Sequence, residues 1–324
     1  MYRRMVVIAA LVMVFTSDVA SAQDYPTRPI TVIVPFSAGG ATDTLARFLG
    51  ERMRAILGQP FIIENVAGAA GSLGVSRAVR SPADGYTLSI GTTTTHVLIG
   101  GLYKLQFDIV RDLEPIIMIG SEPLLIVGRK NLAADDLQGL IGWLKANPDK
   151  GSVGIAGVGA LGHLAGLAFQ KATGTTFQFV PYKGNGPAMQ DLVAEQIDFM
   201  IEPASNFRAL ISAGNVKPFA VTGRKRLPTL PNVPTTDEAG LPNVSALLWY
   251  GLWMPKGTSR GITAKLNAAM TQIMFDPQGR QRFDELGIQI APLDLQTPEA
   301  LRAYQKAETD RWWPIIKAAN IKPE

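Results

Sequence analysis

The sequence predicts an α/β protein of two lobes with a ligand-binding cleft between them. Strand-like and helix-like segments alternate along most of the 324 residues, which is the pattern of α/β layers. One short motif occurs twice, at 34–40 and again at 180–186, about half the chain apart. A proline-rich connection at 225–244 then leads to one more strand and further helices, which we expect to rejoin the first lobe.

The two copies of the motif read VPFSAGG and VPYKGNG, and each stands between a predicted strand and a predicted helix. Proline ends the strand because it has no N–H for the ladder, and glycine lets the backbone curl back. Such a turn gathers free N–H groups and the positive end of a helix dipole at one point, which can bind an anion. A single copy could be an ordinary strand-to-helix turn. The pair indicates two jaws that close on one anionic ligand.

The N-terminus has the three-part pattern of a secretory signal peptide. Arg3 and Arg4 precede an apolar run at 5–15, and Ala20-Ser21-Ala22 fits a small-x-small cleavage site. The apolar run is too short to span a bilayer as a stable helix. We therefore expect cleavage after Ala22, and the paired arginines leave both the general and the twin-arginine export routes open.

Composition argues against several kinds of site. The chain has no cysteine, so disulfides and thiolate sites are ruled out, and export without cysteine is typical of a bacterial periplasm. The net charge is +4, with 224–226 the one tight basic cluster, so no nucleic-acid surface is expected. No segment after the N-terminal run is apolar and long enough to cross a membrane. The chain has two histidines, His96 and His163, far apart and without a carboxylate cluster, so we expect no metal.

The elements of the first lobe follow from local signals. We expect strands at 30–34, 61–64, 86–90 and 116–119, and helices at 42–57 and 72–80. Thr42 or Asp43 would cap the first helix and Gly58 would end it. The third strand runs into hydroxyl side chains at 92–95, which can hydrogen-bond a ligand or cap a short helix. Residues 120–123, before a further strand at 124–127, are the expected crossing into the second lobe.

The second lobe repeats the alternation. We expect helices at 135–146, 162–171, 187–194 and 205–213, and strands at 152–156, 177–180, 197–201 and 216–221. Pro187 suits the first position of its helix, where its missing N–H needs no partner. After the proline-rich connection we expect a strand at 247–254 and helices at 259–276 and 298–319.

Two catalytic patterns occur in incomplete form. Residues 157–162 match G-x-G-x-x-G, but the next strand ends without the carboxylate that would bind a ribose. We interpret them as a further anion-binding helix start, with an exported NAD(P)-binding enzyme as a minor alternative. Ser72 lies in a partial nucleophile elbow that lacks its first glycine, and it is better explained as a helix cap. A serine hydrolase using His96 or His163 as its base is the other alternative.

Together these segments resemble the Bug/TctC family, the extracytoplasmic solute receptors of tripartite tricarboxylate transporters. The likeness covers essentially the whole chain after residue 22. It is carried by 25–30, 34–40 with Asp43, 64–71, 81–86, 163–166, 180–184 and 230–235. The resemblance implies the two-lobed type II periplasmic-binding-protein fold, with a Venus-flytrap cleft. It divides the chain into a signal peptide (1–22), lobe 1 (23–123 and 247–324) and lobe 2 (124–246).

The resemblance also implies a function. The protein would capture a small carboxylate, often a dicarboxylate, for the membrane components of its transporter. It would act as a monomer without catalysis, cofactor or metal. By position, the ligand-binding residues would be Ser37, Ala38, Gly39, Gly40, Asp43, Thr93, Thr94, Gly159, Ala160, Lys183, Gly184, Asn185 and Ala188. The chain departs from the family pattern at 92–95, where asparagine or alanine is more usual, and at Glu202, where aspartate is more frequent.

Overall fold

The structure is a computed structural model that describes residues 25–223, 225–242, 244, 246–318 and 321. The predicted signal peptide at 1–22 lies outside these residues. The strands are β1 (Ile30–Val34), β2 (Phe61–Asn65), β3 (Thr87–Thr92), β4 (Leu113–Arg129), β5 (Ser152–Ile155), β6 (Gln178–Pro181), β7 (Phe199–Pro203), β8 (Val216–Val221), β9 (Leu247–Pro255) and β10 (Gln289–Ile290).

The helices lie between these strands and after the last of them. The α-helices are α3 (Ala41–Leu57), α4 (Ser72–Val79), α5 (Ile99–Leu102), α6 (Leu137–Ala146), α7 (Leu161–Thr173), α8 (Asn185–Val193), α9 (Arg208–Ser212), α10 (Arg260–Phe275), α11 (Pro277–Leu286) and α12 (Pro298–Ala318). Short 3-10 or π turns are η1 (Ala69–Gly71), η2 (Thr94–Leu98), η3 (Ala204–Asn206) and η4 (Leu293–Leu295). None of the described helices combines the length and the apolar character needed to cross a membrane.

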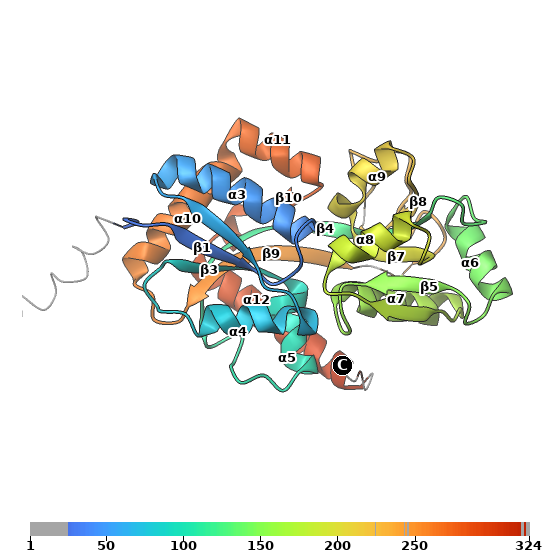
Figure 1. The fold of residues 1–324 in the computed structure, drawn as a ribbon, viewed down its shortest axis with the longest axis horizontal. Helices are drawn as coiled ribbons and strands as arrows, with labels where there is room; N and C mark the ends of the chain where they lie inside the picture. The colour runs from blue at the N-terminus through green and yellow to red at the C-terminus, as the bar shows by residue number, and fades with distance from the viewer. Residues whose placement is uncertain (1–24, 224, 243, 245, 319–320, 322–324) are drawn as a thin grey trace, which may run out of the picture.

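Two groups of strands share one long strand, β4 (Figure 1). In the first group β2, β1 and β3 run parallel, and the antiparallel strand β9 lies between β3 and β4. In the second group β6, β5 and β7 run parallel, and β4 pairs antiparallel with β7 and β8. β4 is paired with β9 as far as Pro123 and with β7 from Leu124 onward. The strand therefore passes without a break from one group to the other.

The continuity of β4 corrects the prediction of separate strands at 116–119 and 124–127. Residues 120–123, the expected crossing between the lobes, lie within this one strand. A Cβ at Gly120 would lie 2.4 Å from the carbonyl oxygen of Gln289, so the glycine admits the backbone of β10 instead of making a turn. The pairing partner of β4 changes directly after Pro123.

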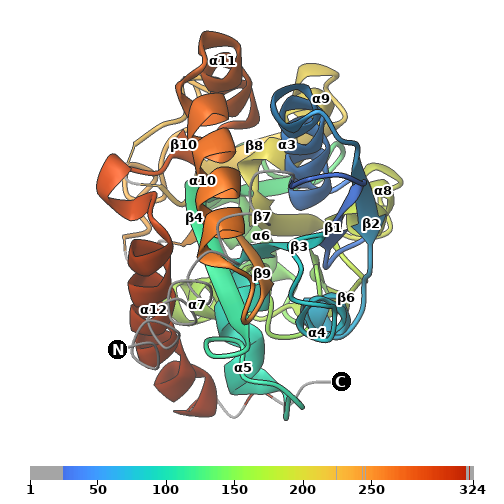
Figure 2. The ribbon, with the colours of Figure 1, turned by 90° about the vertical axis from the view of Figure 1, so that its left-hand side faces the viewer.

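Helices cover both faces of each strand group (Figures 1 and 2). In the first group, α3 and α10 lie over one face, while α4, α5 and α12 lie over the other. In the second group, α8 and α9 lie on one side and α7 on the other. The apolar faces of these helices and the strands between them form the core, whose largest fully buried side chains include Trp249, Tyr250 and Trp253 of β9.

Several element boundaries differ from the predictions. α8 begins at Asn185, so Pro187 is its third residue and not its first. The helix predicted at 205–213 is divided into η3 and the short α9. α11 and β10 were not predicted, although Asp276 caps α11 through the N–H of Gly279, and Gly287 ends it. The described part of the connection 225–244 contains no helix or strand, as expected from its prolines.

Thr222 ties together the two stretches that join the strand groups. Its Oγ1 accepts a hydrogen bond from the N–H of Leu124 over 2.9 Å and donates one to the carbonyl oxygen of Ala246 over 2.7 Å. Leu124 lies where β4 changes partners, and Ala246 directly precedes β9. Because Thr222 is buried, water cannot replace these bonds, so the hydroxyl holds both stretches at a fixed separation.

Replacing Thr222 with valine is therefore expected to destabilise the protein while preserving the side-chain shape. The buried N–H of Leu124 would lose its partner, which costs roughly 1–3 kcal/mol of unfolding free energy. Urea denaturation measures this cost. Thr176→Val is the control because Thr176 is exposed, and it should change stability by less than about 0.5 kcal/mol. Equal stability of the two variants would contradict this role of Thr222.

Candidate functional site

The first jaw is the turn between β1 and α3. Gly39 adopts a φ of 88°, and Gly40 is the cap residue directly before the first turn of the helix. The N–H of Gly39 donates to Asp43 Oδ2 over 3.0 Å, so a residue of the first helical turn reaches back to hold the jaw. The jaw is thus shaped by the helix that follows it.

Asp43 is buried and accepts hydrogen bonds on both carboxylate oxygens. Besides Gly39, its donors are Arg47 Nε and Asn65 Nδ2, each at 3.0 Å. Burial would raise the pKa of Asp43, but the hydrogen bonds from Arg47, Gly39 and Asn65 hold it below its usual value. The prediction that Thr42 or Asp43 caps α3 was wrong, because Gly40 occupies that position. Asp43 instead stabilises the turn, with its charge balanced by Arg47.

The second jaw is the turn between β6 and α8, and it touches the first. Gly184 has a φ of 127°, and a Cβ there would lie 2.6 Å from Ser37 Oγ, so the approach requires glycine. The N–H of Ser37 donates to the carbonyl oxygen of Lys183 over 3.3 Å. The two copies of the motif, far apart in sequence, are therefore in direct contact.

Two helix starts receive hydrogen-bond acceptors from the opposite strand group. The N–H of Ala41, at the start of α3, donates to Asn206 Oδ1 over 2.7 Å. The N–H of Leu161, at the start of α7, donates to Thr94 Oγ1 over 3.1 Å. Helix starts of this kind bind anions readily. In this closed arrangement neutral side-chain oxygens take that place.

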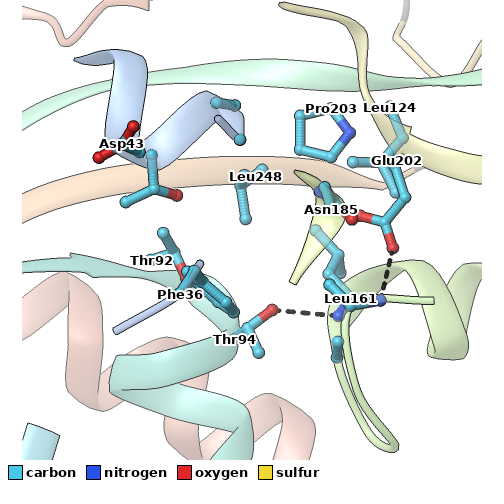
Figure 3. A pocket seen from close by; sticks show the side chains of 15 residues that line it. Phe36, Asp43, Thr92, Thr94, Leu124, Leu161, Asn185, Glu202, Pro203 and Leu248 are labelled. Carbon is cyan, nitrogen blue, oxygen red and sulfur yellow. Dashed lines mark hydrogen bonds between the residues drawn. The ribbon is translucent and has the colours of Figure 1, made fainter. Parts of the chain in front are cut away.

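A cavity of about 30 Å³ lies where these elements meet (Figure 3). Figure 3 shows Thr94 reaching Leu161 from one side, while Asn185 and Glu202 lie together on the other. The cavity is lined by Phe36, Gly40, Ala41, Thr42, Asp43, Thr92, Thr94, Leu124, Ala156, Ala160, Leu161, Asn185, Glu202, Pro203 and Leu248. Its volume suits a water molecule or two and is smaller than a carboxylate of several carbons.

A second cavity, of about 300 Å³, adjoins the first, since Phe36 and Ala156 line both. Its other walls are the loop 68–71, the loop 157–158, Tyr103 and residues 181–183, which include Lys183. A Cβ at Gly157 would lie 3.2 Å from Ala70 Cα, so the two loops meet closely across the cleft. The volume is at the lower end of the range for small-molecule sites.

The predicted ligand-binding residues are distributed over these surfaces. Gly40, Asp43, Thr94, Ala160 and Asn185 line the small cavity, and Lys183 lines the larger one. The remaining residues line neither cavity: Ser37, Ala38, Gly39, Thr93, Gly159, Gly184 and Ala188. Ser37, Ala38, Gly39 and Gly184 belong to the touching jaws.

Three of these residues make packing contacts. Thr93 Oγ1 accepts a hydrogen bond from the N–H of Trp249 in β9 over 3.1 Å. A Cβ at Gly159 would lie 2.1 Å from Leu102, and Ala188 is fully buried in the apolar cluster beneath α8. They support the walls of the cleft from behind.

Two polar residues of the site are absent from the predicted ligand-binding residues, although Glu202 was noted as a departure from the family pattern. Glu202 lines the small cavity, and Asn206 supplies the acceptor for the start of α3. Glu202 carries a usable signal, because it directly follows a predicted strand, where ligand-binding residues of α/β proteins gather. Asn206 has no comparable signal, since its role depends on a helix more than 160 residues away.

The residues proposed for catalysis are engaged elsewhere. His96 is buried, hydrogen-bonded through Nδ1 to Thr95 and stacked on Trp253, while His163 Nδ1 accepts from the N–H of Gly159. Burial lowers the pKa of His96 to about 3 and that of His163 to about 4, so both are neutral near pH 7. Ser72 is the first residue of α4 and not its cap, which is Gly71.

Glu122 is a buried carboxyl group on β4 beside the site. It accepts hydrogen bonds from the hydroxyl of Tyr250 and from the N–H and Oγ of Ser205. Burial raises the pKa of Glu122 to about 7, although the bonds from Tyr250 and Ser205 act in the opposite direction. The carboxyl group thus joins β4, β9 and η3.

Comparison with known proteins identifies what this chain is similar to. The sequence profile of the tripartite tricarboxylate transporter family receptor matches residues 45–321. The solved periplasmic binding protein BugD is 36% identical, covers 93% of this chain and 100% of its own, and has a TM-score of 0.87. Rpa4515 of R. palustris, solved with adipate, is 33% identical over 93% of this chain and 100% of its own, with a TM-score of 0.87. MatC from Rhodopseudomonas palustris, solved with bound malate, is 34% identical and covers 90% of this chain and 100% of its own, with a TM-score of 0.85.

The raised pKa of Glu122 predicts a pH-dependent contribution to stability. The folded protein holds the proton more tightly than the unfolded chain, so the contribution is present below about pH 4.5 and is lost as pH rises to about 7. Glu122→Gln removes this dependence. The wild type should therefore lose unfolding free energy relative to the variant by up to about 1.4 kcal/mol per pH unit in that window. Urea denaturation at several pH values measures the difference, and a difference independent of pH would contradict the assignment.

Proposed function

The chain belongs to the tripartite tricarboxylate transporter receptor family, and from this premise we propose that it captures a dicarboxylate for the membrane components of such a transporter. Proteins of this family are periplasmic binding proteins that act as receptors and not as enzymes. Relatives have been solved with adipate and with malate. The observation that carries the proposal is the pair of helix starts that meet at one small cavity.

Unsatisfied polar atoms at the seam between the jaws support a ligand there. Ser37 Oγ, Asn185 Oδ1 and Asn206 Nδ2 are buried and have no hydrogen-bond partner among the described residues. Buried polar atoms without partners are rare, because each costs desolvation free energy. All three lie on or beside the jaws. Ser37 Oγ and Asn206 Nδ2 can donate to a bound carboxylate, whereas Asn185 Oδ1 can only accept, for example from a hydroxyl group of the ligand.

A carboxylate can be held here without a dedicated cation. Hydrogen bonds to a charged group contribute roughly 1.5–3 kcal/mol each, and micromolar affinity corresponds to about 8 kcal/mol. A few N–H and hydroxyl donors from each jaw would therefore suffice after the cost of ordering the ligand. The second carboxylate of a diacid would extend past Phe36 into the larger cavity, where Lys183 stands.

Ligand entry requires the two parts of the chain to separate. The small cavity has a volume of about 30 Å³, and the jaws that border it are in contact. We propose that lobe 1 (23–123 and 247–324) and lobe 2 (124–246) part by bending where β4 changes partners. A diacid that bridges both jaws then favours the closed state.

The proposed binding is tested on the purified monomer with a panel of mono-, di- and tricarboxylates. Thermal shift and native mass spectrometry should show one bound diacid per chain, released chemically unchanged, with a rise in melting temperature larger than that for monoacids. Stabilisation follows because ligand binds only the folded state. Binding of NAD, or ester hydrolysis lost in Ser72→Ala, would move the assignment to an enzyme.

Glycine variants test whether the jaws form the site. Gly184→Ala should lower affinity at least tenfold by blocking the approach to Ser37, a change of roughly 1.4 kcal/mol. Gly174→Ala is the matched control, because Gly174 also has a positive φ (64°) but meets nothing within 4 Å of an added Cβ. Gly174→Ala should lower the stability of the protein, because of the positive φ, and keep the ligand affinity that titration calorimetry measures. Equal affinities of all three proteins would rule out the jaws as the site.

The periplasmic location is expected to depend on the signal peptide at 1–22. We propose cleavage after Ala22, so the mature chain would begin at Gln23. The intact mass of the protein released from the periplasm measures this directly. A chain that retains residues 1–22 would contradict export by this signal.

A further inference from the structure

The small cavity between the jaws has an unbalanced charge. Two carboxyl groups, Asp43 and Glu202, line it, and none of its lining residues is a lysine, arginine or histidine. Asp43 is paired with Arg47 at 3.0 Å. Glu202 forms no ion pair within the described part of the chain and accepts hydrogen bonds from neutral groups, Ala156 N at 3.3 Å and Asn185 Nδ2 at 3.1 Å. A carboxylate ligand in this cavity would thus meet a carboxyl group without a counter-ion.

Glu202 is held firmly in this position. It follows Ile201 in β7, is 4% exposed, and its carboxyl group packs against the first turn of α7. A Cβ at Gly162 in that turn would lie 2.2 Å from Glu202 Oε1, so the contact exists because residue 162 is glycine. The carboxyl group therefore cannot turn away from the cavity without disturbing α7.

No basic side chain on the elements around Glu202 lines the cavity that it faces. The titratable or charged groups on these elements are Glu114, Glu122 and Arg129 of β4, Tyr250 of β9, His163 and Lys171 of α7, Asp191 of α8, Lys183 before α8, and Asp43, Arg47, Glu51, Arg52 and Arg54 of α3. Of these, Glu114, Arg129, Lys171, Glu51, Arg52 and Arg54 line neither cavity. Tyr250 donates to Glu122, His163 is neutral, Asp191 accepts from Tyr182, and Arg47 is bound to Asp43. Lys183 lines the other cavity. β5, the remaining neighbour, has no titratable residue.

Protonation is the remaining way to remove the charge. Burial raises the pKa of Glu202 to about 7, and the hydrogen bonds from Asn185 and Ala156 offset this only in part. A second negative charge in the same cavity would raise the pKa of Glu202 further, since like charges disfavour ionisation. The neutral carboxyl group then has one O–H to donate.

We propose that Glu202 couples ligand capture to proton uptake: one proton enters from solvent with the ligand, stays on Glu202 and is donated as a hydrogen bond to the ligand carboxylate. This inference rests on the proposed function and narrows its ligand class. A diacid with neutral or hydroxyl substituents fits the protonated residue. A diacid with an ammonium group near Glu202 would instead pair with the ionised residue and take up no proton.

Titration calorimetry of the wild type with malate and with adipate tests the coupling without any mutation. Measured in buffers of different ionisation enthalpy, the heat should report close to one proton taken up per ligand at about pH 8 and little at about pH 5.5. Affinity should fall as pH rises above about 7, by up to tenfold per unit. Binding at every pH without proton uptake would overturn the coupling and leave the proposed function intact.

Glu202→Gln places an N–H where the proposal puts the proton. The variant should bind malate and adipate with no proton uptake, and its affinity should be independent of pH between about 6.5 and 8.5. At about pH 8.5 its affinity should be at least tenfold higher than that of the wild type. Glu122→Gln is the matched control, because Glu122 is also a buried carboxyl group but does not line the cavity, and it should keep the uptake.

Three further results would count against the coupling. The first is that Glu202→Gln takes up as many protons on binding as the wild type. The second is that proton uptake is lost in Glu122→Gln and kept in Glu202→Gln. The third is that the wild type binds aspartate more tightly than malate and takes up no proton with it. Failure of every carboxylate to bind the wild type between about pH 5 and pH 8.5 would be a different result, since it would remove the proposed function together with the coupling.

Discussion

The architecture depends on β4, one strand that belongs to both strand groups. Its first part is paired with β9 and its second part with β7 and β8, so each half of the molecule is built on the same continuous backbone. Thr222 and Glu122 brace it where its partners change, each through hydrogen bonds that reach segments far away in sequence. A shared strand resists sliding of the halves, because sliding would break its ladders. Bending at the change of partner, the motion proposed for ligand entry, would keep them.

This connection brings two helix starts face to face. Each has a backbone N–H whose acceptor comes from the opposite half, Asn206 for α3 and Thr94 for α7. In this structure both donors are therefore satisfied by neutral oxygens. An anionic ligand offers stronger acceptors to the same kind of group, because charge-assisted hydrogen bonds are about twice as strong as neutral ones. The site can thus prefer an anion although its small cavity has no lysine or arginine in its lining.

The buried carboxyl groups near the cleft differ in whether a positive charge lies beside them. Asp43 lies beside Arg47, which balances its charge and lets it hold the first jaw as a carboxylate. Glu122 and Glu202 lack such a partner among the described residues and are surrounded by neutral donors. Desolvation therefore raises the pKa of both, and they are the groups near the site whose charge changes close to neutral pH.

Sequence patterns alone determined the α/β class, the order of most elements and the two jaws. These depend on local properties: the apolar period of a segment, proline at the end of a strand and glycine in a turn. β8 was predicted with its observed bounds for this reason. The same patterns misled at β4, where they predicted two strands and the structure has one. Its pairing with β10 and its change of partner are long-range features that local patterns do not contain.

Only the tertiary structure decided which residues meet at the site. It divided the predicted ligand-binding residues between the cavity walls, as for Thr94, and the packing behind them, as for Thr93. Adjacent residues at the end of a strand point in different directions, and composition does not reveal which one faces the cleft. It also added Asn206 and placed Glu202 in the cavity wall, and both roles depend on groups that approach from other elements. Local propensity carries no information about such long-range contacts, which arise when the shared strand brings the two halves together.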